Sequence, residues 1–427
     1  MKPAAGTGAA DPDATARRNL RWVLAGQSAS LLGDYVSLLA LPLFVVYLTG
    51  SALDLGLTTA LETVPTLLFG FAVGVLLDRA PLRRTLIVAD LGRAVAFLSL
   101  ALAAAAGVAE VWMVFLVAFV VGSLTVTFDS GFQAWLPTLA TDDALVLVNS
   151  RLQFVRSLAW TLGPPLAGYL AGSAGGFRAA FGLDAATFLL SAATLLVLLE
   201  IRPRPTPARD PWLASFRQGI SCLWRMPALR AATLAGTAAN LVFVPMEALL
   251  VLFCREQLGL TDGALIGWFF GGHSLLGALG VIAAPVAVRR LGLGRTFVCG
   301  LAAMGAGFLV LAISAPALSQ LAPGLTTLWA IFPAGLAVTG VSFLNVAFTT
   351  LRQQLPPPGL RGRVIAASRT LAWAGLPVGA VLGGVAGQAF GLPAVYMASA
   401  GTITGMALLL CTTSLWRAPG PSAKTPG

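Results

Sequence analysis

The chain has 427 residues, of which 57% are hydrophobic and only 10% carry a charge. So few charged side chains cannot cover a soluble globule of this size, and the mean hydropathy of +0.85 indicates that most of the surface faces lipid. The net charge of +10 does not indicate a nucleic-acid partner, because the basic residues fall between apolar segments rather than on a polar domain.

Twelve apolar segments have the length that a hydrocarbon core of about 30 Å requires. The predicted spans cover residues 22–48, 55–77, 85–107, 111–133, 152–173, 180–200, 231–253, 264–288, 296–315, 326–350, 365–389 and 392–415. We therefore predict an all-α integral membrane protein. Its predicted parts are a leader (1–20), a six-helix bundle (21–200), a linker (201–230), a second six-helix bundle (231–416) and a tail (417–427).

The first span carries a polar stripe formed by Gln27, Ser30, Asp34 and Ser37 at helical spacing. Asp34 lies about twelve residues into the span, or roughly 18 Å deep. A carboxylate near the bilayer middle is costly unless it is paired or functional. We predict that Asp34 carries a proton and contacts substrate, and that Gln27 and Ser30 contact substrate. The alternative is a structural carboxylate that holds neighbouring helices.

Glu62 in the second span lies at a depth that approaches that of Asp34. Two acids that share one cavity would influence each other's titration. We therefore predict Glu62 as a second proton-coupling residue. The alternative is a residue that faces water at the mouth of the cavity.

The loop after the second span contains Gly74, Asp78, Arg79, Arg83 and Arg84. An acid at the membrane edge can cap the positive end of a helix, and arginines can bridge to carboxylates. Such contacts would hold one face of the protein closed, so we predict a gate. Anchoring to the inner leaflet would explain Arg83 and Arg84 equally well, but not Asp78.

Further charges lie at shallow depth in spans 3 to 5. Asp90 and Arg93 are one helical turn apart in span 3, and Arg156 lies at a similar depth in span 5. We predict that these three form a buried charge network for structure and gating. Asp129 is expected to pair with Arg151 or Arg156.

Span 5 also contains Gly163, Pro164 and Gly168. Small residues permit close helix approach and a proline permits a kink, so we predict a gating role for them. Ordinary packing of small residues is the alternative.

Residues 212–224 of the central linker place large apolar side chains on one side of a helical wheel. This pattern is typical of an amphipathic helix that lies on the inner leaflet. The alternative is an extension of span 7.

The second half contains fewer polar residues within its spans. Asn240 and Glu247 share a face of span 7, and His273 lies midway through span 8. A histidine and a carboxylate can relay protons, so we predict proton coupling by Glu247 and His273. A histidine that is simply hydrogen-bonded inside the bundle is the alternative. The candidate substrate-binding residues of this half are Asn240, Phe243, Trp268, Phe269 and Asn345.

Arginines and lysines fall mainly on one side of the predicted spans, which places both termini and the central loop in the cytoplasm. The two halves also repeat. Residues 74–85 align without gaps with residues 285–296, and Leu136-Pro137 precedes Gly168 by the same interval as Leu355-Pro356 precedes Gly387. We therefore predict two pseudo-symmetric six-helix bundles.

The loop Gly74-x3-Asp78-Arg79-x3-Arg83-Arg84 resembles the signature between spans 2 and 3 of the major facilitator superfamily. This resemblance extends over the full chain and implies the major facilitator fold. It also implies that the loop is a conformational latch of the outward-open state.

Two further segments are similar to one subgroup, the macrolide-efflux and siderophore-exporter-like proteins. Gln27-x2-Ser30-x2-Gly33-Asp34 resembles their first span, and these proteins tolerate a proline such as Pro81, where the superfamily usually has glycine. Span 5 resembles, loosely, the motif of drug:proton antiporters. The resemblance implies export.

We therefore expect a proton-coupled antiporter that exports a lipophilic or amphipathic molecule, such as a drug, a secondary metabolite or a siderophore. A lipid or lysolipid flippase, or an importer of the same fold, is the alternative, and a non-transporting sensor is a more distant one. With one histidine and no ligand cluster, we expect no enzyme activity, no metal and no cofactor besides the proton gradient. The expected setting is the bacterial cytoplasmic (inner) membrane, where the chain acts as a monomer with the bilayer and a small substrate as its partners and no nucleic acid.

Overall fold

A computed structural model describes residues 12–69, 73, 77, 80–139, 142–198 and 212–416, and every regular element within these ranges is a helix. The first half contains α1 (Pro12–Leu48), α2 (Ala52–Phe69), α4 (Leu82–Ala106), α5 (Val111–Trp135), η1 (Leu136–Thr138), α6 (Asp142–Gly172) and α7 (Gly176–Val197). The second contains α8 (Trp212–Arg225), α9 (Pro227–Ala248), α10 (Leu250–Glu256), α11 (Gly263–Leu291), α12 (Leu293–Leu318), α13 (Pro323–Gln354), η2 (Pro358–Leu360), α14 (Arg361–Phe390) and α15 (Leu392–Leu410). Each predicted span overlaps one of these helices.

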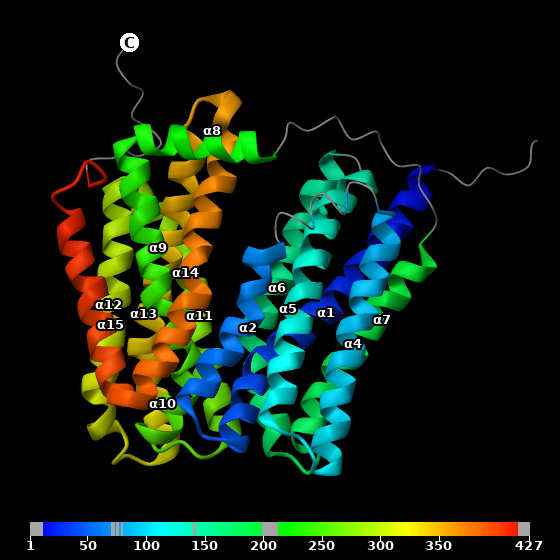
Figure 1. Ribbon diagram of the computed structural model, residues 1–427, viewed down its shortest axis with the longest axis vertical. Helices are drawn as coiled ribbons and strands as arrows, with labels where there is room; N and C mark the ends of the chain where they lie inside the picture. The colour runs from blue at the N-terminus through cyan, green and yellow to red at the C-terminus, as the bar shows by residue number, and fades with distance from the viewer. Residues whose placement is uncertain are drawn as a thin grey trace, which may run out of the picture.

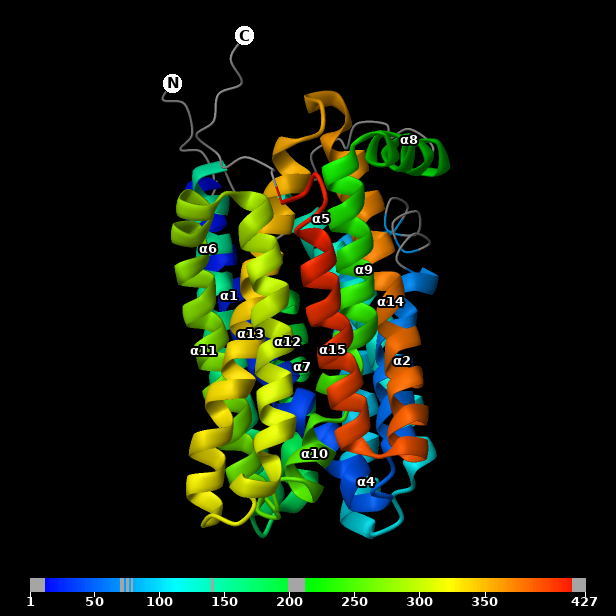
Figure 2. The same ribbon diagram turned by 90° about the vertical axis from the view of Figure 1, so that its left-hand side faces the viewer.

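Eleven helices of the described ranges are long and apolar enough to cross a membrane. The twelfth helix of the bundles is α6, whose first half carries Asn149, Arg151 and Arg156 and is therefore less apolar. α6 packs against α1 of its own bundle and α11 of the other, so it belongs to the helix bundle although its first half is less apolar. The architecture is the predicted one, twelve helices in two bundles of six (Figure 1 and Figure 2).

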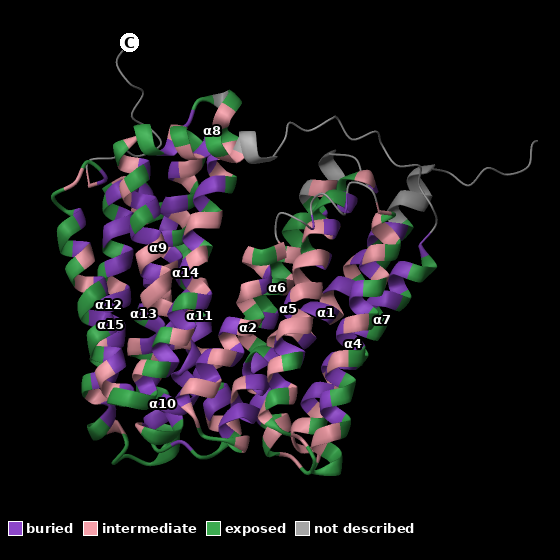
Figure 3. Ribbon diagram, in the orientation of Figure 1, coloured by how far each residue is buried: buried purple, intermediate pink, exposed green. Residues whose placement is uncertain are grey.

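Burial follows what a lipid solvent requires. Buried residues run through the inside of each bundle and through the lower region where the bundles meet, whereas exposed residues lie mainly on the outer faces (Figure 3). Large apolar side chains such as Leu102, Ile282 and Leu408 are exposed. In water so much exposed apolar surface would be unfavourable, but it matches hydrocarbon chains.

The two bundles meet along two seams in which glycines remove the side chains between crossing helices. In the α2–α14 seam, Gly56 faces Gly384, where an added side chain would lie 2.9 Å from the carbonyl oxygen of Ala52. In the α6–α11 seam, Gly168 lies directly against the backbone of Gly263 and Gly267. Both seams lie toward the helix ends opposite α8, and the bundles diverge toward the α8 end (Figure 1).

The seams also carry the internal repeat. Gly168 and Gly387, which occupy matching positions in the two halves, both lie where their own bundle contacts the other: Gly168 against α11 and Gly387 against Ala52 of α2. A short helix lies at each matched Leu-Pro pair: η1 begins at Leu136 and contains Pro137, whereas η2 begins at Pro358, two residues after Pro356. The duplication thus places equivalent small residues in equivalent inter-bundle contacts.

α8 is a separate helix, so the alternative that it extends span 7 is wrong. The chain is extended at Met226, with φ −108° and ψ 98°, and Pro227 then begins α9. α8 crosses the ends of the second bundle (Figure 2) and packs on α14, where Arg363 donates a hydrogen bond to Gln218. Its position on the inner leaflet and the exact domain boundaries stay predictions, since residues 199–211 lie outside the described residues.

The close packing of the α6–α11 seam predicts that two glycine-to-alanine variants differ in their free energy of unfolding. Gly168→Ala places a methyl group against the backbone of Gly263 and must push α6 and α11 apart, so we expect the free energy of unfolding to fall by about 1–3 kcal/mol. Gly182→Ala in α7 meets nothing within 4 Å and should not lower it. Unfolding of the purified proteins in mixed micelles measures both, and equal stability of the two variants would contradict the seam.

Candidate functional site

A cavity of about 220 Å³ lies inside the first bundle and is bounded by side chains from all six of its helices. The charged residues on its wall are Asp34, Glu62, Asp129, Arg156 and Asp184. The rest of the wall is mostly apolar and includes Leu38, Phe97 and Val121. As predicted, Asp34 and Glu62 face the same cavity.

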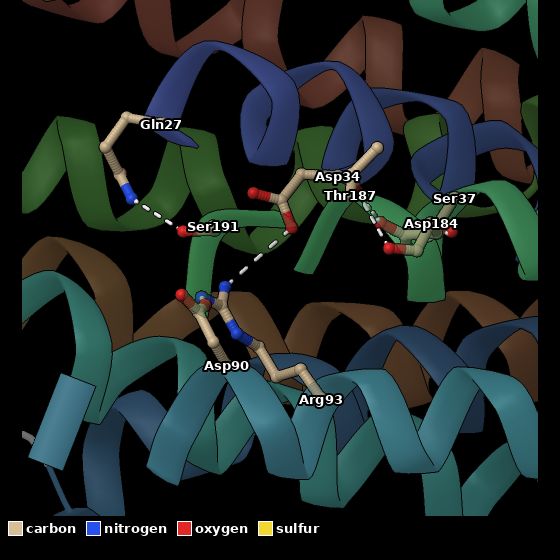
Figure 4. A network of polar contacts seen from close by, with 8 residues as sticks. All are labelled: Gln27, Asp34, Ser37, Asp90, Arg93, Asp184, Thr187 and Ser191. Atoms are coloured by element: carbon tan, nitrogen blue, oxygen red, sulfur yellow. Dashed lines mark hydrogen bonds and ion pairs between the residues drawn. The ribbon is translucent and has the colours of Figure 1, made fainter. Parts of the chain in front are cut away.

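Arg93 of α4 lies behind this wall and links two carboxylates (Figure 4). Its side chain is only 2% exposed; its guanidinium donates a hydrogen bond to Asp90 and lies 3.9 Å from Oδ1 of Asp34. The three-residue interval puts Asp90 and Arg93 on one face of the helix, as expected from the sequence. The Asp90–Arg93 part of the predicted network is therefore present, and Asp34 is an additional partner.

Aromatic rings complete the environment of Arg93. Its guanidinium carbon lies 4.5 Å from the ring centroid of Phe128 and 4.1 Å from that of Phe188. A desolvated cation is attracted by the faces of aromatic rings. The arrangement holds one positive charge at a fixed point between α1, α4, α5 and α7.

A carboxylate of α7, that of Asp184, also links α7 to α1 through a hydrogen bond. Asp184 is fully buried and accepts hydrogen bonds from the hydroxyl groups of Ser37 and Thr187 (Figure 4). Gly33 makes this contact possible, because a side chain there would collide with Thr187 and Asp184.

The predicted polar stripe of α1 divides between the cavity and α7. Asp34 and Ser37 line the cavity, whereas Gln27 and Ser30 are buried and do not line it. Gln27 donates a hydrogen bond of 3.3 Å to Ser191 of α7. Gln27 and Ser30 therefore lie away from this cavity, and their substrate contact stays a prediction.

Asp129 and Arg156, two other charged residues with predicted pairings, line the cavity but form no ion pair with Arg93, Asp90 or Asp34 among the described contacts. Asp129 of α5 and Arg156 of α6 both face the cavity. The described contacts include no direct ion pair between them, although each lies within electrostatic range of the other. The expected pairing of Asp129 is thus at most a longer-range attraction.

The candidate proton relay of the second bundle is not assembled. His273 is buried, its Nδ1 lies 3.0 Å from the carbonyl oxygen of Phe269, and it packs against Phe270. Glu247 has a buried Oε1 without a hydrogen-bond partner among the described residues. Within that part of the chain no bond joins His273 to Glu247, which agrees with a histidine bonded inside its own helix.

The substrate-binding candidates of the second bundle do not converge on one point. Asn240 donates a hydrogen bond of 2.9 Å to the carbonyl oxygen of Ala372, and Phe243 packs against Phe308. Phe269 is buried, whereas Trp268 and Asn345 are exposed. These residues do not line the cavity of the first bundle, and their roles stay predictions.

Part of the predicted gate lies outside the described residues, namely Gly74, Asp78 and Arg79. Arg84 is exposed, and Arg83 donates hydrogen bonds of 2.9 and 2.7 Å to the carbonyl oxygens of Leu195 and Leu196 at the end of α7. Arginine near a helix C-terminus satisfies carbonyls that have no partner within the helix.

The remaining gating candidates lie at helix crossings. Gly163 packs against the backbone of Tyr35 in α1, and the carbonyl oxygen of Pro164 would lie 2.6 Å from a side chain at Gly267. This segment therefore touches both its own bundle and the other one.

Sequence reasoning missed Asp184. The signal was available, because Asp184 stands inside the apolar run of span 6 and the cost argument applied to Asp34 holds there equally. The contact of Arg93 with Asp34 was also missed, since it joins different helices and no spacing rule predicts it.

Comparisons with known proteins agree with the fold. Residues 23–375 match the family model described as Major Facilitator Superfamily. The chain is 26% identical to the multidrug efflux pump Tap of Mycolicibacterium fortuitum, covering 90% of this chain and 93% of the relative. It is 24% identical to macrolide efflux protein A of Streptococcus pyogenes, covering 91% and 94%. The crystal structure of the nucleoside transporter NupG superimposes with a TM-score of 0.75 at 12% identity, covering 92% and 98%.

The contacts of Arg93 with Asp90 and Asp34 predict that a second substitution, Asp90→Asn, restores part of the stability that Arg93→Gln loses. Arg93→Gln leaves the buried Asp90 and the cavity-facing Asp34 without their cation and should lower the free energy of unfolding by about 3–5 kcal/mol. Adding Asp90→Asn removes one of these uncompensated charges and should restore part of the loss. Denaturation of the wild type, both single variants and the double variant measures the coupling, and additive losses would show that the two residues do not interact.

Proposed function

Since the chain belongs to the Major Facilitator Superfamily of membrane transporters, we propose that it exports a lipophilic or amphipathic small molecule in exchange for protons. The relatives named as multidrug and macrolide efflux pumps support export. A lipid flippase or an importer remains the alternative, but nothing in the cavity or in the relatives favours it. The proposed setting is the bacterial cytoplasmic membrane, with both termini inside and one chain as the working unit.

The observation that carries the coupling proposal is the contact of Asp34 with Arg93. Asp34 is 35% exposed and faces the cavity, whereas Arg93 is buried behind it. A proton that reaches Asp34 from the cavity neutralises the carboxylate and removes its attraction to Arg93. Asp90 then holds Arg93 alone. Acids inside membrane spans commonly serve as such proton carriers.

The transport cycle uses the two seams. In the structure the bundles touch at the predicted outer ends and diverge toward the predicted cytoplasmic ends (Figure 1). Substrate would enter from the cytoplasm, and the bundles would then rock so that the glycine seams part and the α8 ends close. The charge state of Asp34 would bias this movement, because α1 contacts both α7 and α6 of its own bundle.

The cavity wall supports an organic substrate. Leucine, valine, alanine and phenylalanine side chains form one part of it, and the five charged residues together with Ser37 and Thr125 form the other. Binding sites with both kinds of surface suit amphipathic organic molecules. A macrolide is a suitable first test compound because one relative is named for macrolide efflux.

Proton-driven uptake into inverted membrane vesicles tests the proposal. An acidic lumen should drive accumulation of the macrolide erythromycin or another lipophilic antibiotic by the wild type, and Asp34→Asn should reduce that uptake to the level of vesicles without the protein. The amide cannot exchange a proton, so the gradient no longer does work on the substrate.

Glu256→Gln is the matched control, because Glu256 is an exposed acid outside the cavity and should be dispensable. Full gradient-driven uptake by Asp34→Asn would exclude Asp34 as the coupling residue. Uptake by the wild type that ignores the gradient would exclude proton coupling altogether.

A further inference from the structure

α8 presents a basic face at one end of the second bundle. Arg217, Trp224 and Arg225 are exposed and lie within an arc of about 100° on the helical wheel. Gly219 and Leu223, on the other side of the helix, are buried. The sequence of α8 contains no acidic residue, so the free side of this amphipathic helix is cationic.

The apolar side of α8 is already occupied by the second bundle. Leu223 is fully buried, and a side chain at Gly219 would collide with the carbonyl oxygen of Arg363 and lie 3.1 Å from Cβ of Ala367. An amphipathic helix that inserts into a leaflet uses a free apolar face. Since that face of α8 packs against protein, the basic face is the one that it offers to the membrane.

α8 lies at the level that lipid headgroups occupy. α14 has 30 residues and is therefore about 45 Å long, which exceeds a hydrocarbon core of about 30 Å. Arg363 and Ala367 belong to its first two turns, so α8 packs beside the projecting end of α14 and crosses the bundle there (Figure 2). The exposed Trp224 fits this depth, because tryptophan favours the interface between membrane and water.

The surroundings of α8 within the second bundle add positive charge and no negative charge. Arg230 of α9 is exposed and donates a hydrogen bond of 3.4 Å to the carbonyl oxygen of Trp224, which places a third guanidinium at the end of α8. The acids of residues 212–416 all lie near the opposite end of the bundle, namely Glu247, Glu256 and Asp262. The second bundle therefore offers no carboxylate to the arginines of α8.

A basic surface at this level matches the phosphate groups of the inner leaflet. Anionic phospholipids give the cytoplasmic leaflet a negative surface potential, which attracts clusters of arginines beside membrane spans. Arginine also binds phosphate through two parallel hydrogen bonds. A zwitterionic headgroup carries a cation of its own, so an anionic headgroup is the better complement to three neighbouring guanidinium groups.

We propose that Arg217, Arg225 and Arg230 bind the headgroups of anionic phospholipids and that these lipids hold α8 against α14. α14 also forms the α2–α14 seam through Gly384, so the bound lipid stabilises a helix that joins the two bundles. The inference depends on no property of the cavity in the first bundle. It stands or falls independently of the proposed export.

Hydrogen–deuterium exchange of the full chain in bilayer discs tests the inference. Discs of phosphatidylcholine are compared with discs of equal parts phosphatidylcholine and phosphatidylglycerol. A ligand that binds only the docked helix lowers the population of the open form, so the amides of residues 212–225 should exchange at least about threefold more slowly in the anionic discs. The amides of α4 in the first bundle supply the reference.

The triple variant Arg217→Gln, Arg225→Gln, Arg230→Gln should lose the difference between the two kinds of disc. Comparing the discs within each variant cancels any direct effect of the substitutions on the stability of α8. The corresponding arginine-to-lysine variant keeps the charge and should keep most of the difference. Arg178→Gln removes an exposed arginine at the opposite end of the molecule and should keep all of it.

Equal exchange of α8 in both discs by the wild type would overturn the inference, and it is the result expected if the basic face docks an acidic protein instead. A difference that survives in the triple glutamine variant would overturn it as well, because another part of the chain would then bind the lipid. Inorganic phosphate added to phosphatidylcholine discs should not slow the exchange. Slowing by phosphate alone would indicate a site for a soluble anion and contradict a lipid-binding surface.

Discussion

The contact of one buried arginine with two carboxylates organises the first bundle. Arg93 cannot stay in a hydrocarbon setting without compensation, and it receives that compensation from Asp90 in its own helix, Asp34 in α1 and the rings of Phe128 and Phe188. These groups come from four helices. Their relative positions are therefore tied to the charge of one side chain, and Asp34 is the member that the cavity can reach.

Because of this dependence, protonation of Asp34 can change how α1 and α4 are held together. Neutralising Asp34 weakens the link between α1 and α4, whereas Asp184 keeps α1 attached to α7 through Ser37. The first bundle thus keeps its hydroxyl–carboxylate hydrogen bonds between α1 and α7 while the ion pair between α1 and α4 changes. Between the bundles the glycine seams lack polar side chains at their closest approach, so they can part without leaving buried charges unpaired.

Much of the architecture follows from the sequence because lipid imposes simple rules. Span length, the placement of arginines and the matched hairpins predict twelve helices in two bundles, and the depth of Asp34 and Glu62 predicts that they share a cavity. The Asp90–Arg93 pair also follows from spacing within one helix.

Contacts between helices are less predictable, because the rotation of each helix about its axis decides them. Gln27 and Asp34 lie on one stripe of α1, yet Gln27 faces α7 and Asp34 faces the cavity. The stripe is wide enough to span both surroundings. For the same reason, a relay between Glu247 of span 7 and His273 of span 8 was predicted from their residue types, but the ring of His273 is bonded to its own helix.

The central claim is that substrate and proton compete through a cavity in which Asp34 holds the exchangeable proton. Proton release on substrate binding tests it directly, using purified protein in weakly buffered detergent with a pH-indicator dye. Addition of the lipophilic antibiotic that the wild type accumulates in the vesicle assay should release protons into solution, and Asp34→Asn should release fewer at equal occupancy. Equal release by the two proteins, or binding without release by the wild type, would contradict the account.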